Sequence, residues 1–104
     1  VGGRRLDLAN RSIGGLGGPL PVDVWVLTRL THLYLHNNSL AALPPEVSQL
    51  SGLHYLTLQH NQLHSLPWQY GLLTQLRTLD LEGNPLTKIS PELLQLPRAD
   101  FFAQ

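Results

Sequence analysis

A repeat of 23 residues constrains the fold of this chain more than any other feature of its sequence. Leucine and asparagine recur at this spacing, and three consecutive units follow the pattern LxxLxLxxNxLxxLPxxVxxLxx in register. A fixed period of this length is the signature of a stacked repeat architecture. The matching columns are Leu30, Leu53 and Leu76, then Leu33, Leu56 and Leu79, then Leu35, Leu58 and Leu81, then Asn38, Asn61 and Asn84, then Leu40, Leu63 and Leu86, then Leu43, Leu66 and Ile89, and in the return half Val47, Tyr70 and Leu93, then Leu50, Leu73 and Leu96.

The repeat divides one domain, residues 1–104, into units at about 3–29, 30–52, 53–75 and 76–98 and a partial unit at 99–104. The first unit matches the second at an offset of 27 in its strand half and of 23 in its return half, so four residues are inserted within the Gly-rich stretch 14–19, a predicted loop. Arg11 stands where later units carry asparagine, which predicts a different first turn. In the partial unit Phe102 falls at the Leu79 position, and Phe101 and Phe102 are expected to extend the core.

Each unit has the pattern of a short strand followed by a helical return. The LxL segment alternates as a strand does, with leucines on one side and variable residues on the other. Stacked units then form one parallel sheet, and their leucines merge into a core that no unit could bury alone. The asparagine is expected to satisfy backbone groups of neighbouring turns. Proline opens the returns 44–50, 67–73 and 91–96, which predicts short helical or 3₁₀ turns on the outer side. The fold class is therefore an α/β solenoid, a right-handed curved arc with the sheet on its concave face.

The strings LTHLYLHNNSLAALPPEVSQLSG, LHYLTLQHNQLHSLPWQYGLLTQ and LRTLDLEGNPLTKISPELLQLPR resemble leucine-rich repeat proteins of the typical intracellular 23-residue kind, with LP after the asparagine loop. The resemblance covers nearly the whole chain. It implies a solenoid that binds other proteins, often as a scaffold in signalling, and that is not an enzyme. The strings LYLxxNxL and EGNPL are also similar to the repeat domain that precedes the nuclease of carbon-catabolite-repression-type deadenylases.

The amino-acid composition limits the classes of binding partner and the cellular compartment that we expect for this chain. Charged residues make up 13% of the chain, seven basic and seven acidic, and Lys88 is the single lysine. Such a chain has neither the basic footprint of a nucleic-acid binder nor the basic stripe of a membrane-surface helix. It has no cysteine, and no apolar run is long enough to span a membrane. The sequence starts at Val1 without a signal-peptide pattern, so we expect an intracellular, cytoplasmic protein of which this chain is a fragment or a mature piece.

The variable positions around the LxL segments are the candidate binding surface. In leucine-rich repeat proteins, partners usually meet these positions on the concave sheet, and alternation turns them away from the core. On the four strands they are Arg5, Asp7, Ala9 and Asn10, then His32, Tyr34, His36 and Asn37, then Tyr55, Thr57, Gln59 and His60, then Thr78, Asp80, Glu82 and Gly83.

Aromatic and imidazole side chains gather in the middle of this surface, and such side chains on a rigid sheet often anchor interfaces. We hypothesise that they form the binding centre, with Arg4 and Arg5 at one end of the array and Asp80 and Glu82 at the other supplying opposite charge. The predicted partner-binding residues are His32, Tyr34, His36, Tyr55, Thr57, Gln59, His60, Asp80 and Glu82.

Sites for metals, cofactors and catalysis are not predicted. His36 and His60 lie on neighbouring strands, but zinc needs three or four converging ligands. Asp80 and Glu82 are about 7 Å apart on one strand, a spacing compatible with the paired carboxylates of a glycosidase. An open sheet does not withdraw either carboxylate from water, however, as an acid catalyst requires. The Gly-rich stretch 14–19 lacks the Lys-Ser/Thr of a phosphate-binding loop.

The leading hypothesis is that the chain is an interaction module. In one alternative the repeats are a regulatory or targeting domain of a larger enzyme. In another they are a structural component of a large assembly. Trp25 and Trp68 lie outside the leucine series. Each is expected to pack on a neighbouring turn, with burial by a missing part of the protein as the alternative. Leu27 takes the core position of Leu50. Neither end of the array shows a polar cap, so flanking sequence or another chain is expected to cover the open ends.

Overall fold

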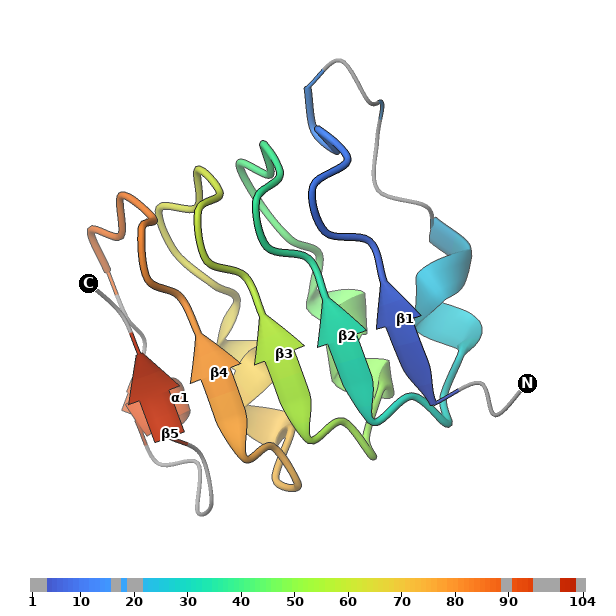
Figure 1. Ribbon diagram of the computed structural model, residues 1–104. Coiled ribbons are helices and arrows are strands. Elements are labelled where there is room, and N and C mark those ends of the chain that lie inside the picture. The colour runs from blue at the N-terminus through green and yellow to red at the C-terminus, as the bar shows by residue number, and fades with distance from the viewer. Residues whose placement is uncertain (1–3, 16–17, 19–21, 89–90, 95–99, 103–104) are drawn as a thin grey trace.

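The computed structural model describes residues 4–15, 18, 22–88, 91–94 and 100–102, which form a parallel sheet backed by short helical segments (Figure 1). In these residues the strands lie side by side in chain order, one strand to each unit. The strands are β1 (Arg5–Asp7), β2 (His32–Tyr34), β3 (Tyr55–Thr57), β4 (Thr78–Asp80) and β5 (Asp100–Phe102). The helical segments between them are η1 (Val22–Val26), η2 (Pro45–Gln49), η3 (Trp68–Leu72) and α1 (Pro91–Leu94).

The register of the first four strands follows the repeat. Leu6, Leu33, Leu56 and Leu79 lie opposite one another across the sheet. This confirms the predicted parallel pairing, including the longer offset of the first unit. Every residue at one place in the pattern therefore stands in a cross-strand row with its equivalents, about 4.8 Å apart.

The predicted register of the last strand was wrong by one residue. Phe101, and not Phe102, lies opposite Leu79. The prediction extrapolated the 23-residue spacing into a partial unit that has no leucine columns of its own to fix the register. A one-residue shift in a strand exchanges the two faces. The predicted core contributions of Ile89, Leu93, Leu96, Phe101 and Phe102 lie outside the described side chains.

The leucine columns form one continuous core between the sheet and the helical turns. Leu33, Leu56 and Leu79 are fully buried at the centres of their strands, whereas their strand neighbours stay half-buried. Tyr70 takes the place of Val47 in the third unit; its ring is fully buried, and its hydroxyl donates to the Pro44 carbonyl at 3.2 Å. Burial of an apolar side chain contributes about 1.5–3 kcal/mol, so these columns supply the main driving force for stacking.

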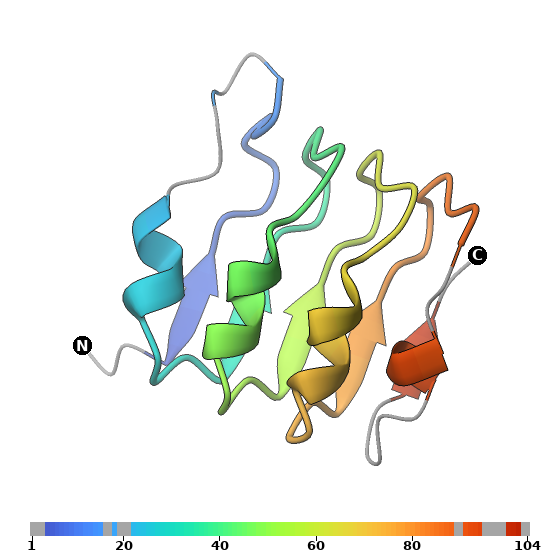
Figure 2. The same cartoon turned by 180° about the vertical axis from the view of Figure 1, so that it is seen from behind.

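The helical turns lie behind the sheet, on the face opposite the one in the foreground of Figure 1 (Figure 2). Pro44 and Pro67 are extended and immediately precede η2 and η3, as the sequence predicts. Both segments are 3₁₀ helices of five residues, and α1 is an α-helical turn that begins at Pro91. Proline suits these starts because its fixed φ and missing N–H cost nothing there.

Trp25 packs into the core, as expected, and is 6% exposed. Its equivalent in η3 is Gly71, where an added Cβ would lie only 2.8 Å from the Cβ of Glu92 in the following turn. This position therefore faces the next unit, and the Trp25 side chain belongs to the buried core. Two other expectations were wrong, because Leu27 is 43% exposed and Trp68 is 53% exposed. In the described residues η1 has a neighbouring helical turn on one side only. Leu27 is therefore covered on one side only, whereas its equivalents Leu50 and Leu73 are buried.

The asparagine of each unit ties its loop to the backbone of the unit before it, as expected. Asn61 is 5% exposed, and its amide nitrogen donates to the carbonyls of Leu35 (2.9 Å) and Leu58 (3.0 Å). Its carbonyl oxygen accepts the N–H of Leu40 at 3.0 Å. One side chain thus satisfies three buried backbone groups, two of which belong to the preceding unit.

Asn38 and Asn84 repeat this arrangement in their own units. The oxygen of Asn38 accepts the N–H groups of Arg11 and Ile13, both at 3.0 Å. Arg11 itself is exposed, although it stands at the asparagine position. The first turn also differs as predicted, because Ser12 adopts a positive φ of 54° that its equivalents do not show.

Replacing Asn61 by Ala is expected to lower the free energy of unfolding by about 2–4 kcal/mol, because three buried backbone groups lose their partner. The change is measured by urea unfolding followed by circular dichroism. The control is Gln62→Ala at the adjacent exposed position, which should change stability by less than about 0.5 kcal/mol. Equal unfolding midpoints for the two variants would contradict the bridging role of the asparagine.

Candidate functional site

The sheet face is the solvent side of β1–β4 together with the turn that follows each strand. On each of β2, β3 and β4 the central leucine is fully buried and the two flanking residues are half-buried, so the flanking side chains point to solvent. This places the predicted candidate positions together on one surface. We use the name sheet face for these residues, which are Arg5, Asp7, Ala9, Asn10, His32, Tyr34, His36, Asn37, Tyr55, Thr57, Gln59, His60, Thr78, Asp80, Glu82 and Gly83.

Four rings form a continuous row at the centre of the sheet face. His32 lies opposite Tyr55 in the register, and their rings stack at 4.5 Å with an angle of 24°. His32 also approaches Tyr34 at 6.1 Å, and Tyr34 meets His36 edge-on at 6.3 Å. These spacings are typical of favourable aromatic pairs. The structure therefore brings together four of the five predicted central residues, whereas His60 lies outside the row and is exposed.

Two threonines hold the imidazoles of the ring row in place. Thr31 Oγ1 lies 2.8 Å from His32 Nδ1, and Thr57 Oγ1 lies 2.9 Å from His36 Nδ1, so each pair shares a hydrogen bond whose donor depends on the histidine tautomer. Thr31 was not among the predicted site residues, since nothing in the repeat pattern marks a side chain that supports another. Rings fixed in this way lose little conformational freedom on binding, which favours affinity.

The environment of His32 favours its neutral form. Desolvation by the surrounding side chains lowers the pKa of His32 below its ordinary value of 6.5, and the positive charge of Arg5 and the proximity of His54 lower it further. A neutral imidazole stacks on Tyr55 without carrying a charge into the centre of the face. The ring row is therefore uncharged at His32 near neutral pH.

The titration of His32, followed by NMR of its ring protons, is expected to have a midpoint below 6.5. Because the unfolded state then binds more protons than the folded state, this residue makes the protein less stable as the pH falls through 6.5 towards the folded pKa. Arg5→Gln should move the midpoint back towards 6.5, and Arg29→Gln, which removes an exposed arginine that does not act on His32, should leave it in place. A midpoint at or above 6.5 in the natural chain would contradict this assignment.

The remaining predicted site residues lie on the side of the sheet face towards β4. Asp80 is half-buried and its carboxylate accepts the Glu82 N–H at 3.1 Å, while Glu82 is exposed. Thr57 contacts His36, as described above. Gln59 is half-buried, and its Oε1 is enclosed without a hydrogen-bond partner among the described residues.

A column of left-handed residues borders the sheet face where the strands end. Asn10, Asn37, His60 and Gly83 occupy equivalent positions and have φ values of 60°, 56°, 59° and 77°. Asparagine and glycine tolerate this conformation, and histidine does so at some cost. An added Cβ at Gly83 would lie 2.5 Å from Nδ1 of His60, so glycine also makes room for that imidazole.

Gly83→Ala is expected to destabilise the fold by about 1–2 kcal/mol, because it combines a positive φ with a contact against the His60 ring. Introducing His60→Gly as well removes that imidazole and tolerates the left-handed conformation, so the same substitution at Gly83 should cost less in the double variant. Chemical unfolding of the four members of this cycle measures the coupling. Strictly additive changes would show that the imidazole does not occupy the space above the glycine.

Each end of the array carries charged residues of both signs beside those of the predicted binding centre. Arg5 shares β1 with Asp7, and Arg77 directly precedes β4, which carries Asp80. Each end of the sheet therefore carries both signs of charge. The prediction had compared Arg4 and Arg5 with the acidic residues of β4 alone.

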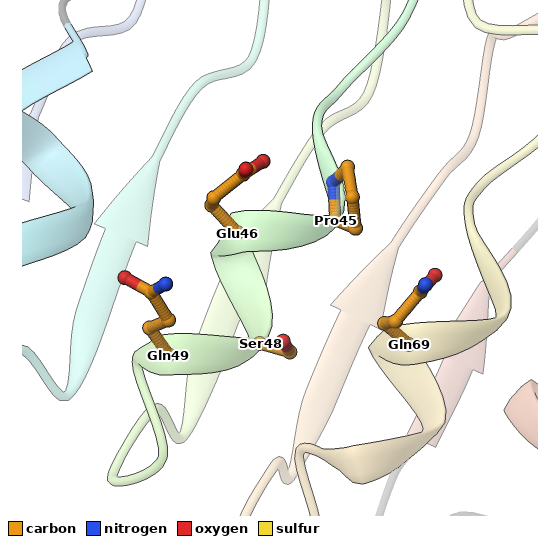
Figure 3. A pocket seen from close by; sticks show the side chains of 5 residues that line it. All are labelled: Pro45, Glu46, Ser48, Gln49 and Gln69. Carbon is orange, nitrogen blue, oxygen red and sulfur yellow. The ribbon is translucent and has the colours of Figure 1, made fainter.

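Other features of the described residues do not form a second site on this face. No group of three or more His, Cys, Asp or Glu side chains within them could hold a metal ion, and no helix among them is long and apolar enough to cross a membrane. A depression of about 200 Å³ lies on the opposite side, between η2 and η3 (Figure 3). It is smaller than the usual ligand pocket of roughly 300–1,000 Å³. Its lining residues are Pro45, Glu46, Ser48, Gln49 and Gln69.

Comparison with known proteins agrees with this architecture. The family model described as leucine rich repeat matches residues 28–86, more than half of the chain. The chain belongs to the leucine-rich repeat family. A solved leucine-rich repeat protein of Leptospira interrogans is 39% identical, with a TM-score of 0.66 over 79% of this chain. The match covers 21% of the Leptospira chain, so the present chain spans about one fifth of its length. No curated protein matches.

Members of the leucine-rich repeat family generally bind other proteins, and the repeat fold is typically non-catalytic. The residues that distinguish one member from another are those that the repeat does not fix. In this chain they are the side chains of the sheet face, the exposed residues of the helical turns and the first loop.

Proposed function

We propose that this chain is a protein-binding module of scaffold or adaptor type whose sheet face contacts its partner. The observation that carries the proposal is the row of four rings, Tyr55, His32, Tyr34 and His36, held on adjacent strands in mutual contact. Tyrosine supplies a large contact area with a polar tip, and residues of this kind are enriched where interfaces gain most of their energy.

The location of the ring row within the fold supports its role as a binding centre. Its members occupy positions that the repeat leaves free, since the core is built from the leucines on the other side of the same strands. The rings are half-buried by one another, so a partner needs to exclude only their outer faces from water. A rigid parallel sheet presents them in one arrangement, which lowers the entropy cost of association.

We further propose that the module does not catalyse a reaction itself. Glu82 is exposed, and Asp80 is engaged by the Glu82 N–H in the turn that follows β4, so neither carboxylate is enclosed as an acid catalyst requires. The absence of cysteine and the intracellular type of the repeat favour a role in the cytoplasm.

Tyr34→Ala combined with Tyr55→Ala is expected to weaken partner binding by at least about tenfold, because it removes the two largest anchors of the ring row. Proteins captured from a lysate of the source cells are compared between the natural chain and the double variant, and the affinity of each captured protein is then measured with the purified pair.

The matched control is Trp68→Ala with Leu72→Ala, which removes two exposed apolar side chains from the helical side. Unfolding curves of both variants show whether the fold is kept. Capture that the control abolishes and the tyrosine variant preserves would move the binding surface to the helical side and overturn the proposal.

A further inference from the structure

The charged residues of the sheet face and of the row that precedes it are separated along the strand direction. Three arginines stand where the strands begin, and the register places Arg5 in the row of His32 and Tyr55. Arg4 and Arg77 occupy the preceding row, where the Arg4 carbonyl accepts the Thr31 N–H at 2.8 Å and the Arg77 N–H donates to the His54 carbonyl at 2.7 Å. All three arginines are exposed. Among the described residues, this border of the sheet is basic.

Three carboxylates stand where the strands end. Asp7 and Asp80 flank Tyr34 and Thr57 in one cross-strand row. Glu82 follows Asp80 by two residues and is the repeat equivalent of Gln59. Both residues immediately precede the left-handed position of their unit. Asp7 and Asp80 each accept the N–H of the second following residue, at 3.0 and 3.1 Å, which fixes both carboxylates at this border. Among the described residues, the opposite border of the sheet is acidic.

The ring row runs from one border to the other, because His32 and Tyr55 share the cross-strand row of Arg5, and Tyr34 shares the row of Asp7 and Asp80. Four residues separate the Arg5 row from the Glu82 row, which is about 13 Å along an extended strand. An α-helix with its side chains is about 10–12 Å wide. Across β1–β4 the sheet spans three strand spacings, about 14 Å, which matches roughly ten helical residues, or three turns.

We propose that the partner presents an amphipathic α-helix that lies across the strands of the sheet face. The apolar stripe of this helix packs on Tyr34 and Tyr55. Its acidic flank faces Arg4, Arg5 and Arg77. Its basic flank faces the border of Asp7, Asp80 and Glu82. This inference rests on the proposed function and adds to it the shape and the charge polarity of the partner. Complementary charges of this kind determine orientation and association rate more than affinity.

The test uses a display library of three-turn helices with a fixed apolar stripe and flanks that vary among glutamate, lysine and neutral residues. Helices are selected on the 104-residue chain at pH 7.5, where His32 is neutral. Selected helices are expected to carry glutamate on one flank and lysine on the other. Their binding should be lost with Tyr34→Ala/Tyr55→Ala.

A charge-exchanged variant tests the polarity directly. Arg77→Glu with Glu82→Lys exchanges one charge at each border of the fourth unit and leaves the net charge unchanged, and both residues are exposed. The association rate constant of the selected helices is expected to fall about tenfold at low salt. The matched control is Glu46→Lys with Lys88→Glu, which exchanges two exposed charges outside the sheet face and should leave the rate unchanged.

Selected helices that require the tyrosines but show no segregation of charge, or that tolerate the charge-exchanged variant, would overturn this inference and leave the proposed function standing. Helices that bind the tyrosine variant as well as the natural chain would overturn both, because the sheet face would then not be the binding surface. Segregated charge, together with loss of binding to the tyrosine variant, slower association with the charge-exchanged variant and an unchanged rate with the control, would support both.

Discussion

The buried asparagine amides connect the units on which every other feature depends. The pairing of three-residue parallel strands cannot by itself provide hydrogen-bond partners for the backbone N–H and carbonyl groups of the loop that follows. That loop turns inward towards the core. Asn61 resolves this by bonding the carbonyls of Leu35 and Leu58 and the N–H of Leu40, so two adjacent units share one side chain. The net value of each such bond is small, but leaving the same backbone groups buried and unpaired is costly. The amides therefore fix how far one unit is rotated and displaced from the next.

This fixed stacking separates the structural residues from those that are free to vary. Leucine columns fill the interior, and Tyr70 shows that the same column can accept a larger ring when its hydroxyl reaches a carbonyl. The solvent side of the sheet carries no part of that core. Side chains there are constrained only by their neighbours in the cross-strand rows, which is why a repeat scaffold can present a chain-specific surface. In this protein that surface combines a ring row, in which the lowered pKa of His32 favours its neutral form, with borders of opposite charge.

Most of the fold could be predicted from the sequence because the repeat is a local and redundant signal. The strand positions, the parallel order, the core columns and the proline-led turns follow from periodicity. The members of the sheet face could also be named, because alternation along a strand decides which side each residue takes. Their contacts could not be named. The support of His32 by Thr31, the stacking on Tyr55 and the space that Gly83 leaves for His60 depend on register between units and on side-chain direction.

The sequence by itself determined that this chain is a stacked leucine-rich repeat with a variable sheet face, since 23-residue periodicity admits no other burial of its leucines. Only the tertiary structure decided the features that involve a second unit. It placed Phe101 opposite Leu79, buried Trp25 while leaving Trp68 exposed, and separated the charges along the strands. The physical reason is that the burial and the electrostatic environment of a side chain depend on the neighbouring surface that packs against it. A one-dimensional pattern specifies each surface but not the partner that it meets.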